Sequence, residues 1–265
     1  MTQPKAGSCS VTAIRVGTLT VDKANLLYGE PRGREVVDVP VWCGLIKTED
    51  TYILVDTGIR DPSWVADNNL GSCHQGALDT MTGALGHLGL TCADIQVVIN
   101  SHLHFDHCAN NYLFPQATFL VGDKEWGASR QPVEDQAVLY SAKEWLLEPL
   151  TESSYTLVEE DQFEVVPGVR VMKTPGHTPG HQVVLVDTGE GTISIAGDAV
   201  NCNENFLRDR PGGIVWDLEL AIASLEKIRE HSDSVLMAHD VRIADFQEGN
   251  FPSVPGPTEV TGGCC

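Results

Sequence analysis

The residues best suited to chemistry in this chain lie in the heptapeptide Ser101–His107, which reads SHLHFDH. Imidazole and carboxylate groups are preferred ligands of zinc and similar divalent ions. His102 and His104 are two residues apart, so in an extended segment their side chains point the same way. Asp106 and His107 follow after the chain has turned, where they can approach a second ion. The spacing HxHxDH therefore predicts a metal site.

The segment before the heptapeptide indicates which element positions it. Residues 95–100 read IQVVIN, a short apolar run rich in β-branched side chains that is typical of a buried strand. The histidines and the aspartate thus follow directly where a strand ends and a loop begins. Side chains at such a position are held by a rigid scaffold and are well placed for binding or catalysis.

Five motifs in a fixed order resemble the signature of the metallo-β-lactamase superfamily. They are LVDTG at 54–58, SHLHFDH at 101–107, TPGHTPGH at 174–181, AGDA at 196–199 and MAHD at 237–240. The wording is most similar to the acyl-homoserine lactonase branch, through SHLHFDH, the stretch at 163–182 and Glu204-Asn205-Phe206. The resemblance implies an α/β (α+β) protein with an αββα sandwich. The length of 265 residues predicts one such domain.

The resemblance also implies a dinuclear metal centre built from seven side chains. By this resemblance, one ion is held by His102, His104 and His177, and the other is held by Asp106, His107 and His239. Asp198 bridges the two ions. Zinc is the default ion, although nitrogen and oxygen ligands also fit iron, cobalt or manganese. Two divalent ions lower the pKa of bound water to about 7 and polarise a carbonyl oxygen, so Asp106 and Asp198 are candidates for hydrolytic catalysis.

Four further side chains are expected near the metal centre. Asp56 is expected to accept a hydrogen bond from a ligand histidine or a loop of the site, or else to form a turn at a strand end. His181 is expected to support the site or to bond the Gly/Pro loop. Phe105 is expected to pack against substrate or in the core. Asn201 stands where acyl-homoserine lactonases carry a tyrosine, so it is expected to bind substrate and assist catalysis, or to cap the turn after Asp198.

The expected activity is metal-dependent opening of a lactone ring. N-acyl-homoserine lactone, the substrate of quorum-quenching lactonases, is the first choice, and Asn201 leaves another lactone open, such as a pyridoxolactone-like bicycle. A glyoxalase-II-like thioesterase is a further alternative. That family carries basic helices near its C-terminus, whereas the segment after His239 here is mostly acidic or Pro/Gly-rich. An aspartate rather than a cysteine at position 198 favours lactone, ester or thioester hydrolysis over penicillin hydrolysis.

Charge and composition restrict the classes of molecule that this chain is expected to bind. A formal net charge of −20 disfavours nucleic acid and anionic membranes, because their phosphates would be repelled. Neither a secretory leader nor a membrane-spanning run is evident, so a cytoplasmic location is expected. The eight cysteines form no CxxC pair, so no disulfide is expected. A small lactone is therefore the expected partner, and a homodimer is left open.

Apolar periodicity predicts the elements around the site. Strands are predicted at residues 11–19, 39–47, 51–55, 117–121, 163–166, 169–173, 182–186, 192–195 and 235–238. Helices are predicted at 80–88, from Asp123, at 132–147 and after Asp217, where Leu218, Ile222, Leu225 and Ile228 recur at helical spacing as core residues. Residues 25–38 and 59–79 are predicted loops, the second lying over the site. The Pro/Gly-rich sequence from about residue 252 predicts a frayed tail.

Overall fold

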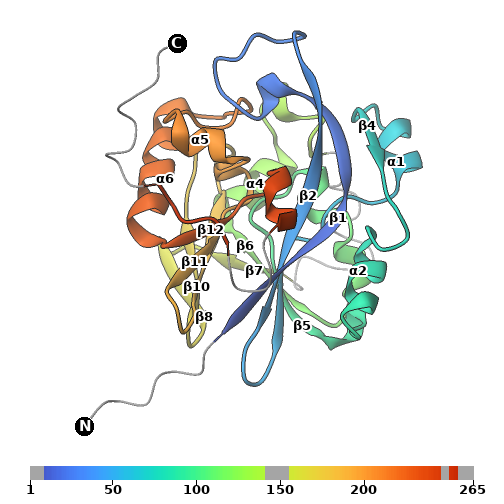
Figure 1. Ribbon diagram of the computed structural model, residues 1–265, viewed down its shortest axis with the longest axis vertical. Coiled ribbons are helices and arrows are strands. Elements are labelled where there is room, and N and C mark those ends of the chain that lie inside the picture. The colour runs from blue at the N-terminus through green and yellow to red at the C-terminus, as the bar shows by residue number, and fades with distance from the viewer. Residues whose placement is uncertain (1–8, 141–154, 246–250, 256–265) are drawn as a thin grey trace.

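The computed structural model describes residues 9–140, 155–245 and 251–255. Two sheets face each other, and helices cover their outer sides (Figure 1). The first sheet has seven strands in the order β4-β1-β2-β3-β5-β6-β7, and the second has five in the order β12-β11-β10-β9-β8. This is the αββα sandwich that the sequence predicts.

The first sheet begins as an antiparallel hairpin and continues as a parallel sheet. Its strands are β1 (Ser10–Asp22), β2 (Val36–Lys47), β3 (Tyr52–Val55), β4 (Ser72–His74), β5 (Ile95–Ile99), β6 (Thr118–Gly122) and β7 (Tyr155–Val158). Strands β3, β5, β6 and β7 pair in parallel. Their carboxyl ends therefore meet at one edge, where the metal-site loops begin.

The second sheet is antiparallel except at one end. Its strands are β8 (Gln162–Val166), β9 (Val169–Lys173), β10 (Gln182–Asp187), β11 (Thr192–Ile195) and β12 (Ser234–Leu236), the last of them parallel to β11. Strand β10 is apolar at four successive positions and buried throughout them. That pattern is typical of a strand covered on both faces. It places the Gly/Pro loop before β10 opposite the loop that follows β5.

The helices complete the two outer layers. They are α1 (Pro62–Asp67), α2 (Met81–His87), α3 (Phe105–Cys108), α4 (Asp123–Arg130), α5 (Asn203–Leu207) and α6 (Leu218–His231). One apolar core, which includes Leu85, Phe119 and Trp126, lies under α2 and α4. The other joins both sheets to α6 through residues such as Ile53, Val184 and Leu225.

Five of the sequence predictions need correction. Residues 59–79 contain α1 and β4 rather than a loop alone, and β2 begins at Val36, inside the predicted loop at 25–38. The helix predicted at 132–147 is only a 3-10 turn, Glu134–Gln136, over residues 132–140, and 141–147 lie outside the described residues.

The other two corrections concern packing. Ile222 is 43% exposed, because the buried face of α6 follows Ala221, Ser224, Leu225 and Ile228 instead. The tail stays attached beyond residue 252, since Ser253 pairs with Ser234 and Val254 packs on the core. Residues 256–265 lie outside the described residues.

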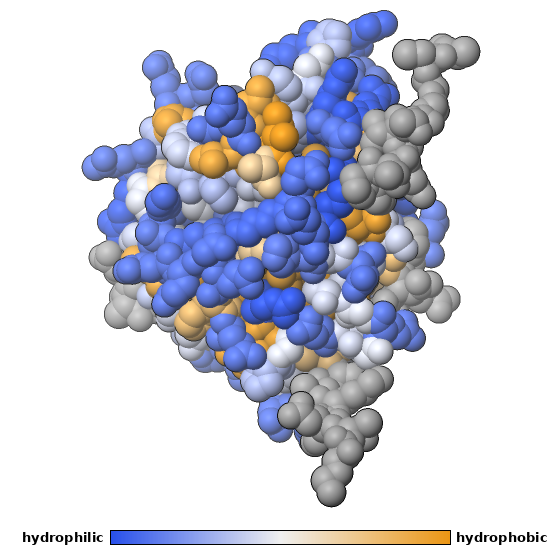
Figure 2. All heavy atoms as spheres, turned by 90° about the vertical axis from the view of Figure 1, so that its left-hand side faces the viewer, coloured by the Kyte–Doolittle hydropathy of each residue, from blue (hydrophilic) through white to orange (hydrophobic). Residues whose placement is uncertain are grey.

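The face drawn in Figure 2 is covered largely by hydrophilic side chains, with separate apolar patches between them. Within the described residues, no helix combines the length and the apolar character needed to cross a membrane.

Candidate metal centre

The start of the loop after β5 is held by hydrogen bonds to two neighbouring strands. The Asn100 N–H donates to the Leu120 carbonyl over 2.9 Å, and the Gln182 N–H donates to the Ser101 carbonyl over 2.9 Å. The chain stays extended through His104, which is the N-cap of α3. The helix then places Asp106 on its first turn. The strand end, the extended pair and the turn lie where the heptapeptide spacing predicts them.

All seven candidate ligands are brought together from four separate segments. They form three overlapping groups whose ligand atoms lie within 4.8 Å of one another: His102, His104 and His177; His102, His107 and Asp198; and Asp106, His107 and His239. Every one of these side chains is buried. Residues far apart in the sequence thus converge on one small volume.

The first group, which we call the three-histidine subsite, consists of His102, His104 and His177. The Nε2 of His177 lies 3.2 Å from His102 Nε2 and 3.0 Å from His104 Nδ1. His177 Nδ1 donates to the Ile214 carbonyl over 2.7 Å, which leaves the Nε2 lone pair directed at the other two rings. Burial lowers the pKa of all three histidines. They are therefore neutral, as a metal ligand must be.

The other group, the aspartate subsite, consists of Asp106, His107 and His239. Asp106 Oδ2 lies 3.7 Å from His107 Nε2 and 3.6 Å from His239 Nε2. His239 Nδ1 lies 2.9 Å from the Pro40 carbonyl, which fixes its ring. Burial alone would lower the pKa of His107 and His239, but Asp198 and Asp106 outweigh it and raise both pKa values.

Asp198 lies between the two subsites. Its Oδ1 is 3.1 Å from His107 Nε2 and 3.2 Å from His239 Nε2, while its Oδ2 is 3.4 Å from His177 Nε2. It is carried by the turn that follows β11, where Gly197 has a positive φ of 48°. A Cβ at Gly197 would lie 2.7 Å from Ser101 Oγ, so only glycine lets this turn approach the loop after β5.

The donor set fits divalent cations. His107 Nε2 and Asp198 Oδ1 are fully buried and make no hydrogen bond of acceptable geometry with the part of the chain that is described. Leaving a buried polar atom unsatisfied costs about 1–3 kcal/mol, and a coordinated cation would remove that cost. Nitrogen and oxygen donors without sulfur suit zinc and the neighbouring divalent metals. The clusters are therefore consistent with a dinuclear metal site.

Asp56 lies directly behind the aspartate subsite. Its Oδ2 is 2.8 Å from His107 Nδ1, and its carboxylate also accepts from the backbone N–H and the hydroxyl of Ser101, each over 2.7 Å. Asp56 has a left-handed φ of 62°, a strained conformation for a residue other than glycine. One carboxylate thus orients a candidate ligand and the loop that carries two others.

His181 and Phe105 lie on the outer sides of the cluster. His181 belongs to none of the three metal-ligating groups and makes a 2.9 Å contact with Thr174 Oγ1 in the same Gly/Pro loop. Phe105 is buried in the core, with its ring 6.4 Å from that of Trp64, and one side of it lines a cavity.

The side-chain amide of Asn201 fills only part of its hydrogen-bonding capacity. Its Nδ2 donates to the Leu26 carbonyl over 3.3 Å, and its Oδ1 is buried without a partner among the described residues. Capping of the turn after Asp198 would require Asn201 Oδ1 to accept a hydrogen bond, and it accepts none from the described residues. Asn201 lines the same cavity as Phe105 and His239.

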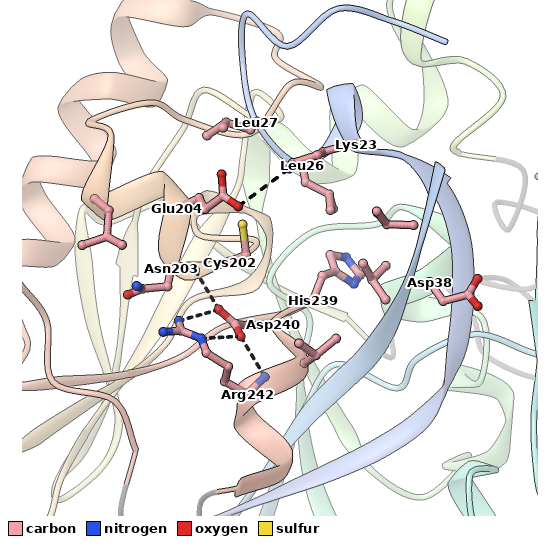
Figure 3. A pocket seen from close by; sticks show the side chains of 14 residues that line it. Lys23, Leu26, Leu27, Asp38, Cys202, Asn203, Glu204, His239, Asp240 and Arg242 are labelled. Carbon is pink, nitrogen blue, oxygen red and sulfur yellow. Dashed lines mark hydrogen bonds and ion pairs between the residues drawn. The ribbon is translucent and has the colours of Figure 1, made fainter. Parts of the chain in front are cut away.

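Two cavities open beside the metal cluster and share Leu26, Val39 and His239. The smaller, of about 90 Å³, is lined by Phe105, Asp106, Asp198, Asn201 and His239 among others. The larger, of about 460 Å³, is mainly apolar and includes Leu27, Val37, Leu207 and Val241 (Figure 3). Its two cationic side chains are paired, Arg242 with Asp240 at 2.7 Å and Lys23 with Glu204 at 3.9 Å, and Asp38 accepts a hydrogen bond from the Thr20 hydroxyl. A substrate reaching the cluster can thus place an apolar part in the larger cavity.

Sequence reasoning missed Glu125, which is fully buried beneath the metal loops. It accepts four hydrogen bonds, from Leu103, Tyr140, Thr178 and Gly180. Burial raises its pKa above the ordinary value. It lies outside the five motifs, and an acidic residue in the first turn of a helix usually signals an exposed position, so the sequence carries no sign of this role.

Comparison with known proteins establishes the family. Residues 36–238 match the sequence profile of the metallo-beta-lactamase superfamily, which is most of the chain. The chain belongs to the metallo-beta-lactamase superfamily. The superfamily membership and the sandwich fold predicted from the five motifs are thereby confirmed.

Within this superfamily, the chain is similar to N-acyl homoserine lactonases. One from Bacillus sp is 35% identical over 221 residues, which cover 78% of this chain and 84% of the relative. A solved N-acyl homoserine lactone hydrolase with N-hexanoyl-L-homoserine at its catalytic metal centre has a TM-score of 0.74 and 28% identity, covering 91% and 96% of the two chains.

A second solved structure is a variant of B. thuringiensis AiiA with N-decanoyl-L-homoserine bound at its active site. It has a TM-score of 0.75 and 27% identity, again covering 91% and 96% of the two chains. The protein is thus a metallo-hydrolase related to the N-acyl homoserine lactonases.

Proposed function

We propose that this protein is a dinuclear metal-dependent lactonase that opens N-acyl-homoserine lactones. The observation that carries the proposal is the position of Asp198, whose two carboxylate oxygens lie within 3.4 Å of histidines from both subsites. A carboxylate placed in this way can bridge two ions and set their separation. In this assignment the three-histidine subsite holds one ion and the aspartate subsite holds the other, zinc being the default for both.

The reaction adds water across an ester bond. Two divalent cations would supply a water of lowered pKa and an electrophile for the carbonyl oxygen. The C–O bond of the ring breaks, the hydroxyl of water joins the carbonyl carbon, and its proton goes to the leaving oxygen. Asp106 lines the smaller cavity, so its carboxylate is placed to hold that proton in transit. Asn201 is placed to donate an amide N–H to the carbonyl oxygen, directly or through a water.

The larger cavity supports a substrate with an apolar chain. Its lining includes Leu27 and Val241, its two cationic side chains are already paired with carboxylates, and it meets the smaller cavity at His239. A lactone bound at the metal cluster could therefore extend a hydrocarbon chain into it, and burying each methylene there contributes about 0.8 kcal/mol. Two solved relatives hold N-hexanoyl and N-decanoyl homoserine at their active sites, which supports the same substrate class here.

A different lactone is the second candidate, and Asn201 favours it. The tyrosine of acyl-homoserine lactonases presents a longer reach than asparagine, and the Asn201 amide is already tied to Leu26. A bulkier or bicyclic lactone would bring its carbonyl closer to this shorter donor.

The test is a hydrolysis panel on zinc-loaded protein. It compares homoserine lactones of increasing chain length, other γ- and δ-lactones, and a glutathione thioester. The proposal predicts the highest kcat/KM for an acyl-homoserine lactone, rising with chain length. Highest activity on a lactone without an acyl chain would favour the second candidate, and preference for the thioester would contradict both.

A further inference from the structure

Glu125 is a buried carboxylate that joins two metal-binding loops without being close enough to bind metal in either group. It is the third residue of α4, is 0% exposed, and belongs to none of the three metal-ligating groups. Within the described part of the chain, no lysine or arginine forms an ion pair with it. Its charge is balanced only by hydrogen bonds, and burying a carboxylate without a cationic partner costs folding free energy.

Each oxygen of Glu125 serves one loop. Oε1 accepts from the backbone N–H of Leu103 over 3.0 Å, and Leu103 is the residue between His102 and His104. Oε2 accepts from Thr178 Oγ1 over 2.6 Å and from the Gly180 N–H over 3.2 Å, just after His177. One side chain therefore connects the segments that carry all three ligands of the three-histidine subsite.

Close backbone packing makes this connection stiff. A Cβ on Gly180 would collide with the backbone of Glu125, and a Cβ on Gly122 would collide with the Gly180 carbonyl. The Gly/Pro loop is thus pressed against the start of α4. The hydroxyl of Tyr140 also donates to Oε1 over 2.9 Å, and its ring packs edge-on against His104 with centroids 4.7 Å apart.

We propose that Glu125 is a positioning residue that holds the His102–His104 segment against the His177 turn and thereby sets the cation affinity of the three-histidine subsite. The idea rests on the proposed function, because it takes that subsite as a metal site. None of the three ligands there is a carboxylate, so the nearby buried carboxylate of Glu125 also favours a divalent cation. The aspartate subsite, whose ligands Asp106, His107 and His239 make no contact with Glu125, is not expected to depend on it.

The test measures zinc dissociation constants by chelator competition in proteins that retain a single subsite. In a His239→Ala background the three-histidine subsite is the intact one, and in a His177→Ala background it is the aspartate subsite. Glu125→Gln keeps the size of the side chain but loses the charge and turns an amide N–H₂ toward donors. We expect it to weaken zinc binding roughly tenfold to hundredfold in the first background and to leave the second unchanged.

Three further variants separate positioning from general loss of structure. Glu125→Asp keeps the charge but is too short to reach both loops, so an effect close to that of Glu125→Gln assigns the role to the connection. Thr178→Val removes one of the four hydrogen bonds and should weaken binding roughly threefold to tenfold. Val169→Ala lowers stability from a buried position at the end of β9 remote from the Gly/Pro loop, and should leave zinc affinity unchanged.

Unchanged zinc affinity for both Glu125→Gln and Thr178→Val in the His239→Ala background would overturn the inference. Equal weakening of both subsites would also overturn it, because Glu125 would then support the fold in general. These readouts need no substrate. Normal zinc binding without hydrolysis of any lactone in the panel would therefore contradict the proposed function alone. A His239→Ala protein that binds no zinc would contradict both the proposed function and this inference.

Discussion

The two halves of the metal cluster differ in how they are charged and held. The three-histidine subsite contains only imidazoles, and its supporting partners are the Ile214 carbonyl, the Ser101 hydroxyl and, one layer further out, Glu125. The aspartate subsite has a carboxylate of its own, Asp106, and a second one, Asp56, in contact with His107. One half is neutral at its centre and the other is acidic.

This difference appears in the protonation of the metal-free site. Burial lowers the pKa of His102 and His104, so they are neutral before any ion binds. His107 and His239 have raised pKa values, because Asp198 and Asp106 outweigh the effect of burial. These two rings therefore keep a proton up to higher pH than His102 and His104 do. A cation entering the aspartate subsite competes with protons more strongly than one entering the three-histidine subsite.

The largest effect is expected from the residue that the two halves share. Asp198→Asn keeps the size of the side chain but removes the charge that both subsites contact. We expect the fold to persist and kcat/KM on the best lactone to fall at least about a hundredfold, on the scale of losing a preorganised catalytic group. Steady-state kinetics with thermal unfolding as the control will measure this. Wild-type turnover in this variant would show that Asp198 is not the bridge.

A smaller effect, larger in one half than in the other, is expected from Asp56. Asp56→Asn retains a hydrogen-bonding side chain but removes the charge that orients His107. We expect zinc affinity of the aspartate subsite to fall roughly tenfold to hundredfold, as for other partners of metal ligands. Chelator competition in the His177→Ala background measures it. A smaller loss is expected in the His239→Ala background, because Asp56 reaches His102 only through Ser101. An equal loss in both backgrounds would erase the distinction between the two halves.

The sequence predicts the ligands better than it predicts what holds them. The ligand motifs are short and local, and strand β5 is a run of buried apolar residues, so both can be recognised without the fold. Glu125 depends on contacts with loops about 20 and 55 positions away in the chain, and no local pattern records such contacts. The prediction that Ile222 is buried fails for a similar reason. Helical spacing alone does not determine which of two overlapping faces of α6 meets the sheet.

Acidification should release zinc from the two subsites at different pH values. A histidine with a raised pKa takes up its proton at higher pH. As pH falls, protons therefore compete with metal in the aspartate subsite first, beginning above the ordinary histidine pKa of about 6.5. The lowered pKa values of His102 and His104 keep the other subsite competent to lower pH. Zinc content of the two single-subsite variants after dialysis at graded pH measures the order. Coincident loss, or loss from the three-histidine subsite first, would contradict it.

The smallest effect is expected at Asn201, whose side chain donates to Leu26 and not to a ligand of either half. Asn201→Ala should lower turnover on the best lactone roughly threefold to tenfold, the value of one neutral hydrogen bond, without changing zinc content. Asn201→Tyr should shift preference toward homoserine lactones. If both variants keep the wild-type rate and preference, Asn201 has no part in binding the substrate.

The most direct measurement follows activity while zinc is returned to metal-free protein. Bound zinc and hydrolysis of an N-acyl-homoserine lactone are recorded together after each addition. If both halves of the cluster hold an ion and both are needed, activity will rise to a plateau at two zinc ions per chain. Full activity at one zinc ion per chain, with no further gain from the second, would contradict the dinuclear centre.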